Sequence, residues 1–178
     1  TFKGSKLNEL AVAIFSNSGL REIEMPTAIT SIGNNAFEST YIEEIVIPNS
    51  VTSLGIGTFM NCQKLKTVYL GTGITEIGIG AFAIGYDGLF PEGNHPNGLT
   101  DIYCPADIDP DKWSFFYSSN AEGERAFLVD FESWEGFLDG STHTNDHTPR
   151  LHLKPDTDLT KWNSRFNGKN VTIAADLC

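Results

Sequence analysis

The sequence predicts an α/β solenoid, in which coils made of a short strand, a turn and a returning leg stack on one another through parallel strands. Three observations predict this fold class. A block of about twenty-two residues occurs three times in succession. Each copy has apolar residues at the same five offsets, and each then has a glycine and a phenylalanine at two more. The columns are Leu20, Ile42 and Leu65; Ile23, Ile45 and Val68; Met25, Ile47 and Leu70; Ile29, Val51 and Ile74; Ile32, Leu54 and Ile77; Gly33, Gly55 and Gly78; and Phe37, Phe59 and Phe82.

Each block begins with a short alternating segment that predicts a strand. In the second copy, Ile45 and Ile47 face the interior, and Pro48 ends the strand because proline cannot donate a hydrogen bond to a sheet. On the return leg we expect Gly55 to adopt a positive φ and Thr58–Phe59 to form a short helical turn that buries the ring. One coil cannot bury its apolar face alone, so stability must come from contacts between neighbouring coils.

The period of about twenty-two residues lies in the range of leucine-rich repeats. The expected fold is therefore a right-handed leucine-rich-repeat solenoid, horseshoe-like, with parallel strands, short helical or 3-10 turns and an irregular C-terminal cap. We expect the strands near residues 22–25, 44–47, 67–70 and 101–104. The expected organisation is an N-terminal half-repeat or cap at 1–19, repeats at 20–108 with an insertion at 86–98, and a C-terminal capping region at 109–178 that extends the sheet.

The C-terminal region contains two similar segments that depart from the repeat. In each, a strand ends at a proline, and an acidic turn leads into a short helix with an inward tryptophan and phenylalanine. The first runs from Cys104-Pro105 to Phe116 and the second from Lys154-Pro155 to Phe166. We also expect strands at 126–131 and 171–174, a helix-like segment at 132–140 and a polar loop at 140–149.

Composition excludes several classes of partner. The 178-residue chain carries a formal net charge of −11, which disfavours binding to nucleic acid or to an anionic membrane, because both reward clustered Lys and Arg. No apolar run is long enough to span a membrane. The chain begins at Thr1 and lacks a basic segment followed by an apolar one, as expected of a processed or truncated chain.

Three widely spaced cysteines do not form a disulfide framework or a zinc motif. Cys104 occupies an inward strand position and Cys62 follows the core phenylalanine, so both are expected to be small buried apolar residues. A disulfide from Cys178 to one of them stays open. We expect no cofactor.

The repeat residues resemble a known family. The segments LKTVYL and IPNSVTSLGIGTFMNC are similar to the BspA-like class of bacterial leucine-rich repeats, whose blocks run through a strand, a proline, Ser-Val-Thr-x-Ile-Gly and Ala-Phe-x-x-Cys. The resemblance extends from about Leu10 to Ile108. It implies a secreted or cell-surface bacterial protein, often from a host-associated species, in which the solenoid binds proteins or matrix components.

Candidate chemistry in the chain has a simpler explanation in each case. His143 and His147 lie among turn-forming residues without the glutamate of a metalloprotease motif, so a surface loop is expected. The spacing of Asp107, Asp109 and Asp111 imitates a calcium loop, but the required glycine and closing glutamate are missing, which favours a helix N-terminus. No catalytic arrangement is present, and we expect neither an enzyme nor a metal site.

The side of the strands opposite the core is the candidate binding surface. Alternation places two rows there, and we expect it to be the concave face of the solenoid. The rows are Glu22, Glu44, Thr67 and Asp101, and Glu24, Val46, Tyr69 and Tyr103. Tyrosine is favoured at interfaces, so Tyr69 and Tyr103 are the expected centre of binding. The alternative is that these side chains only stabilise the sheet through cross-strand pairs.

Two hypotheses of function follow. The first is a non-enzymatic surface or secreted recognition module that binds a protein or extracellular-matrix ligand, or a glycan, as bacterial adhesins do. The second is a structural spacer or C-terminal cap of a larger surface protein with no ligand of its own.

Overall fold

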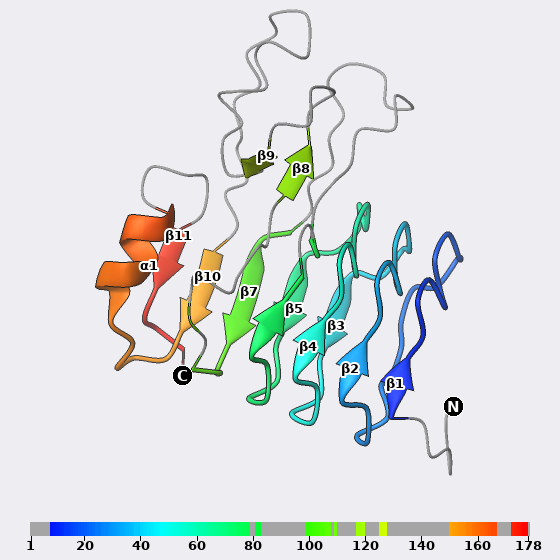
Figure 1. Cartoon of the computed structure of the whole chain (residues 1–178), viewed down its shortest axis with the longest axis horizontal. Coiled ribbons are helices and arrows are strands. Elements are labelled where there is room, and N and C mark those ends of the chain that lie inside the picture. The colour runs from blue at the N-terminus through cyan, green and yellow to red at the C-terminus, as the bar shows by residue number, and fades with distance from the viewer. Residues whose placement is uncertain are drawn as a thin grey trace, which may run out of the picture.

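The computed structural model describes residues 8–78, 81–82, 99–107, 109, 117–119, 125–127, 150–166 and 172–177. In Figure 1 the coils follow one another along the long axis of the molecule, from β1 near the N-terminus to β11 and α1 at the opposite end. The expected insertion at 86–98, the segment at 132–149 with its two histidines, most of the first C-terminal segment, and Cys178 lie outside the described residues.

Two parallel sheets form the two sides of the solenoid. The five-stranded sheet has the order β11-β10-β7-β5-β3, and the four-stranded sheet has the order β1-β2-β4-β6. The first consists of β3 (Glu44–Val46), β5 (Thr67–Tyr69), β7 (Asp101–Cys104), β10 (Arg150–Leu153) and β11 (Thr172–Ala174), and the second of β1 (Glu9–Leu10), β2 (Ser31–Ile32), β4 (Ser53–Leu54) and β6 (Glu76–Ile77). The remaining elements are the antiparallel pair β8 (Tyr117–Ser119) and β9 (Arg125–Phe127), and the helix α1 (Leu159–Phe166).

The predicted leucine-rich-repeat solenoid is confirmed. Strands β3, β5 and β7 coincide with three of the four predicted strands, and every pairing between them is parallel. The fourth prediction is wrong, because residues 21–26, all of them described, form no strand. One repeat separates Glu22 from Glu44, and like charges at directly opposite positions destabilise a ladder. The sheet therefore ends at β3, although Met25 is still buried.

A stack of phenylalanine rings runs through the core as predicted. The ring centroids of Phe15 and Phe37 are 5.3 Å apart, those of Phe37 and Phe59 are 5.1 Å apart, and those of Phe59 and Phe82 are 5.5 Å apart. The backbone follows the same spacing, because the amide of Phe37 donates to the carbonyl of Thr58 in the next coil at 2.8 Å. Phe37 and Phe59 are completely buried, and each ring contacts its neighbours on both sides.

The predicted reason for the glycine column is wrong. Gly55 has no positive φ; instead its backbone lies against the preceding coil. A Cβ atom on Gly55 would lie 2.6 Å from the amide nitrogen of Asn34 and 2.7 Å from the carbonyl carbon of Gly33, and Gly78 makes the same close approach to Gly55. The glycine column therefore exists so that neighbouring coils can approach within hydrogen-bonding distance, as in the 2.8 Å bond from the amide of Gly55 to the carbonyl of Ile32.

Positive φ angles occur at two other columns, four residues apart. They are Ala13, Asn35 and Gly57, with φ of 54°, 56° and 60°, and Asn17, Ser39 and Asn61, with φ of 55°, 55° and 59°. In place of a helical segment, Thr58 and Phe59 lie in a hydrogen-bonded turn closed by the 2.9 Å bond from the amide of Met60 to the carbonyl of Gly57, and a second turn overlaps it, closed by the 3.3 Å bond from the amide of Cys62 to the carbonyl of Phe59. Left-handed residues on both sides prevent these turns from joining into a helix.

The C-terminal strands β10 and β11 continue the five-stranded sheet, and α1 follows β10. The second predicted helix is confirmed as α1, with Trp162 buried. Asp158 caps this helix, because its carboxylate accepts a 2.9 Å hydrogen bond from the amide of Thr160 and this bond lowers the pKa of the carboxyl group. The strands predicted at 126–131 and 171–174 overlap β9 and β11.

Replacing Phe59 by Ala removes a ring that is stacked on both sides, and should lower the free energy of unfolding by about 3–5 kcal/mol. Urea denaturation of the parent and the variant measures this difference. A loss below about 1 kcal/mol would show that the ring does not fill the core.

The substitutions Gly55→Ala and Gly57→Ala form a matched pair. Gly55→Ala should lower the free energy of unfolding by about 3 kcal/mol or more, because the new methyl group meets backbone atoms of the preceding coil. Gly57→Ala should cost about 1 kcal/mol, because it suffers the positive φ but meets only the side chains of Asn35 and Met60. Urea denaturation of both variants tests the order, and the reverse order would contradict the close-approach explanation.

Candidate functional site

The outward side of β3, β5, β7 and β10 carries two rows of side chains, and we call this surface the strand face. Adjacent strands pair in a constant register, which aligns Val46 with Tyr69, Tyr69 with Tyr103, and Tyr103 with His152. These aligned side chains form the first row, which consists of Val46, Tyr69, Tyr103 and His152. The second row lies beside it and consists of Glu44, Thr67, Asp101 and Arg150. The alternate residues Ile45, Val68, Ile102 and Leu151 are buried in the core.

The rings of the first row form one continuous stack. The centroids of Tyr69 and Tyr103 are 4.9 Å apart with an interplanar angle of 9°, and those of Tyr103 and His152 are 4.3 Å apart with an angle of 10°. Both separations are close to the distance between neighbouring strands, so the rings stack in the direction that crosses the sheet. Val46 continues the row on β3 and is 59% exposed, whereas His152 is 8% exposed.

His152 is fixed by two carboxylates. Its Nε2 atom lies 2.8 Å from Oδ1 of Asp101 on β7, and its Nδ1 atom lies 2.8 Å from Oδ1 of Asp176, which follows β11. An ionised carboxylate only accepts hydrogen bonds, so both contacts are hydrogen bonds when both ring nitrogens carry protons. The bond from His152 is the main reason why the pKa of Asp101 lies below its usual value. His152 thus joins three neighbouring parts of the sheet.

Tyr103 lies between the ring of Tyr69 and the imidazole of His152. Partial removal from water, followed by the negative charge of Asp101, raises the pKa of its hydroxyl group. The phenol, which is neutral near pH 7 at its ordinary pKa, therefore stays protonated to a still higher pH.

The structure places the predicted site residues as follows. Tyr69, Tyr103, Val46, Thr67, Glu44 and Asp101 all lie on strands of the five-stranded sheet and point outward. Glu22 and Glu24 are exposed, but they lie in the segment that forms no strand. Asp101 differs from the other acidic residues because it is engaged by His152.

Sequence analysis did not identify His152, Arg150 or Asp176. The signal for His152 was present, since Leu151 and Leu153 alternate with it and predict that it faces outward. The two C-terminal segments were compared by matching their prolines, which placed Lys154 opposite Cys104 and therefore assigned His152 to the inward side of the strand. In the structure Leu153, and not Lys154, pairs with Cys104, so that alignment is one residue out of register and reverses the two faces of the strand.

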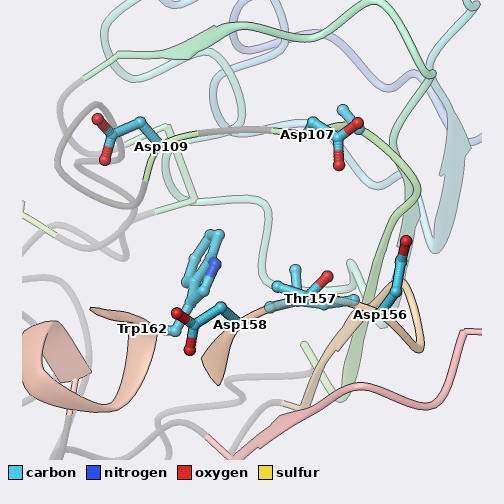
Figure 2. A pocket seen from close by; sticks show the side chains of 8 residues that line it. Asp107, Asp109, Asp156, Thr157, Asp158 and Trp162 are labelled. Atoms are coloured by element: carbon cyan, nitrogen blue, oxygen red, sulfur yellow. The ribbon is translucent and has the colours of Figure 1, made fainter. Parts of the chain in front are cut away.

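A hollow of about 370 Å³ lies between the end of β7 and the start of α1. Figure 2 shows Asp107 and Asp109 on one side, and Asp156, Thr157, Asp158 and Trp162 on the other. Three of its four carboxylates have local roles: Asp107 pairs with Lys154 and raises the pKa of that lysine, Asp109 pairs with Lys161, and Asp158 caps α1. In the described part of the chain, no group of three or more His, Cys, Asp or Glu residues is arranged to hold a metal ion.

The two described cysteines, Cys62 and Cys104, are free and buried, as expected for small apolar residues. Burial raises the pKa of both thiols, that of Cys104 to about 11, so neither is a reactive thiolate. Among the described residues, no helix combines the length and apolarity required to cross a bilayer.

The stacked coils, parallel strands and phenylalanine core define a leucine-rich-repeat protein. Residues 2–86 match the family model of the BspA type leucine rich repeat region, in six copies, and this part of the chain belongs to that family. No curated protein matches the sequence significantly.

The solved structures that this chain matches include three bacterial proteins. The pneumococcal vaccine antigen PcpA has a TM-score of 0.52 at 15% identity, over 98% of this chain and 37% of that one. A leucine-rich cell surface protein from Faecalibacterium prausnitzii has a TM-score of 0.36 at 16% identity, over 95% of this chain and 58% of that one. A leucine-rich repeat protein from Bacteroides ovatus has a TM-score of 0.32 at 14% identity, over 94% and 52%. This chain spans between 37% and 58% of the length of these structures, and the first similarity shows a shared fold.

The contact between Asp101 and His152 makes stability depend on pH. Because folding lowers the pKa of Asp101, its contribution is fully present above the unfolded value of about 4 and is lost as the pH falls through the lower folded value. Asp101→Asn should therefore be about 1 kcal/mol less stable than the parent at pH 6, a value reduced for the partial exposure of the carboxylate.

Urea denaturation of both proteins between pH 6 and pH 3 measures this difference, which should shrink below about pH 4. Glu9→Gln, an exposed change on β1, is the charge-matched control. A difference that does not vary with pH, or one equal to that of the control, would contradict the assignment.

Proposed function

We propose that this chain is a non-enzymatic recognition module of a bacterial cell-surface or secreted protein, and that it binds a protein or extracellular-matrix ligand as adhesins do. The contact surface is the strand face, centred on Tyr69 and Tyr103. The observation that carries the proposal is the ring stack on an outward sheet surface, beside the exposed Val46. The bacterial surface location is part of the proposal and rests on the class of repeat in residues 2–86.

Aromatic side chains that are already ordered lose little conformational entropy when a partner binds. The parallel rings of Tyr69 and Tyr103 are held in place by each other and by His152. Both side chains lie on the outward side of the sheet, where tyrosine can offer apolar area together with a hydrogen bond. Such preorganised aromatic groups are typical of residues that contribute most of the binding free energy at protein interfaces.

A structural role is the second candidate, in which the chain spaces or caps a larger surface protein without a ligand of its own. The observation that favours it is the clamp of His152 between Asp101 and Asp176, which fastens the last strands of the sheet. A titration of the chain against immobilised host matrix proteins and glycans separates the two functions. Saturable binding supports recognition, and no binding at high micromolar concentration supports the structural role.

Tyr69→Ala and Tyr103→Ala should each weaken binding to a matrix protein identified by that titration by about 1 kcal/mol or more, because each removes ordered aromatic contact area. Ile56→Ala is the matched control, since Ile56 is an exposed apolar residue that follows β4 on the other side of the solenoid. Surface plasmon resonance measures all three affinities. If the tyrosine variants bind like the parent and Ile56→Ala does not, the strand face is not the binding surface.

A further inference from the structure

The ring stack on the strand face is closed at one end and open at the other. At the closed end, Tyr103 is covered on one side by Tyr69 and on the other by His152, which two carboxylates hold in place. At the open end, one face of Tyr69 is covered by Tyr103, and its second face points toward β3. The residue next to that second face is Val46, whose side chain is too short to cover a phenol ring. Tyr69 is accordingly 37% exposed.

Uncompensated negative charge surrounds the open end. Glu44 lies on β3, diagonally across from Tyr69, and Glu22 and Glu24 lie one repeat earlier in the exposed segment that forms no strand. All three are exposed, and within the described residues none of them forms an ion pair or a side-chain hydrogen bond. A cation that binds here meets carboxylates without having to displace an existing partner.

Two basic side chains of the same chain, those of Arg21 and Lys66, have partners of their own. The guanidinium of Arg21 lies over the ring of Tyr41, with its central carbon 5.4 Å from the ring centroid. The ammonium of Lys66 lies 3.5 Å from the carboxylate of Glu43. The open end therefore combines an apolar residue, an accessible aromatic face and nearby carboxylates. The chain as a whole is also acidic, with a formal net charge of −11.

We propose that the open end, formed by Glu44, Val46 and Tyr69, binds an arginine-bearing segment of a partner protein. A guanidinium is planar, so it can lie flat on the second face of Tyr69 and extend the stack by one further layer. From that position its N–H groups reach the carboxylate of Glu44, and the aliphatic part of the arginine side chain covers Val46. Lysine offers the same charge, but it lacks the flat surface that the open ring face selects.

This inference rests on the proposed function and narrows it to partners with an exposed basic segment. The strand face would orient such a segment, since a guanidinium can join the stack at the Tyr69 end and is excluded at the His152 end. The acidic residues would also accelerate association with a basic partner, and this contribution weakens as salt is raised.

The test is a calorimetric titration of the whole chain at low salt with three capped peptides of equal length, made of arginine, lysine or citrulline. The arginine peptide should bind at least about threefold more tightly than the lysine peptide, because only it can stack on the ring. The citrulline peptide keeps the planar group without the charge and should bind least. Equal affinity for the arginine and lysine peptides would overturn the inference by indicating attraction between charges alone.

Two variants locate the site. Tyr69→Leu keeps an apolar side chain and should weaken arginine-peptide binding by about two- to fivefold, while lysine-peptide binding changes little. Glu44→Gln should weaken binding of both peptides more than Glu76→Gln does, a control with the same charge change at the exposed Glu76 on the other sheet. Circular dichroism melts establish that each variant is folded. Equal effects of Glu44→Gln and Glu76→Gln would overturn the inference.

The failure of this inference is distinct from failure of the proposed function. If Tyr69→Ala weakens binding to a matrix protein but the arginine peptide shows no preference over lysine, the strand face is a recognition surface that does not select arginine. If no matrix protein binds and the arginine preference is present and depends on Tyr69, the open end is a site whose partner lies outside that panel.

Discussion

Close backbone contact between successive coils is the constraint on which the rest of the structure depends. Each coil buries its apolar side only against its neighbours, so the distance between coils must remain constant along the solenoid. The glycine column permits that distance, since a Cβ atom at Gly55 would strike the backbone of the preceding coil. The phenylalanine rings fill the core at the same spacing, between 5.1 and 5.5 Å from one centroid to the next. Backbone and core thus specify one repeat distance.

The same distance determines what the outer surface presents. Parallel strands in constant register put equivalent residues of adjacent coils side by side, which is why Tyr69 and Tyr103 stack at 4.9 Å. When adjacent coils both have an aromatic residue at the same outward strand position, the strand spacing alone brings the two rings into a stack. The identity of the outward residues can therefore vary while the solenoid is kept, which is the property that the proposed recognition role of the strand face requires.

Much of the fold followed from the sequence because the repeats have a regular period. Once Ile45, Val68 and Ile102 were aligned, the register of β3, β5 and β7 followed, and with it the outward positions of Tyr69 and Tyr103. The C-terminal region lacks this period. One extra residue before Pro155 shifted the alignment of β10, and His152 was lost from the predicted surface. The sequence identified the glycine column but not its cause. A recurring glycine indicates that a side chain is not tolerated there, and it does not show whether the reason is a positive φ or a close approach of another backbone segment.

The two candidate functions assign different roles to the same His152 contact. In a structural cap, Asp101, His152 and Asp176 fasten β7, β10 and the segment after β11, and the ring stack is a by-product of that fastening. In a recognition module, the same three groups immobilise one end of the stack, so that a ligand meets rings that are already ordered. The roles are compatible, because fixing the last strands is also what closes the stack on one side. The two candidate roles therefore differ at the opposite end of the stack, where the second face of Tyr69 lies open beside the exposed Val46 and Glu44: the recognition role needs this open face and the structural role does not.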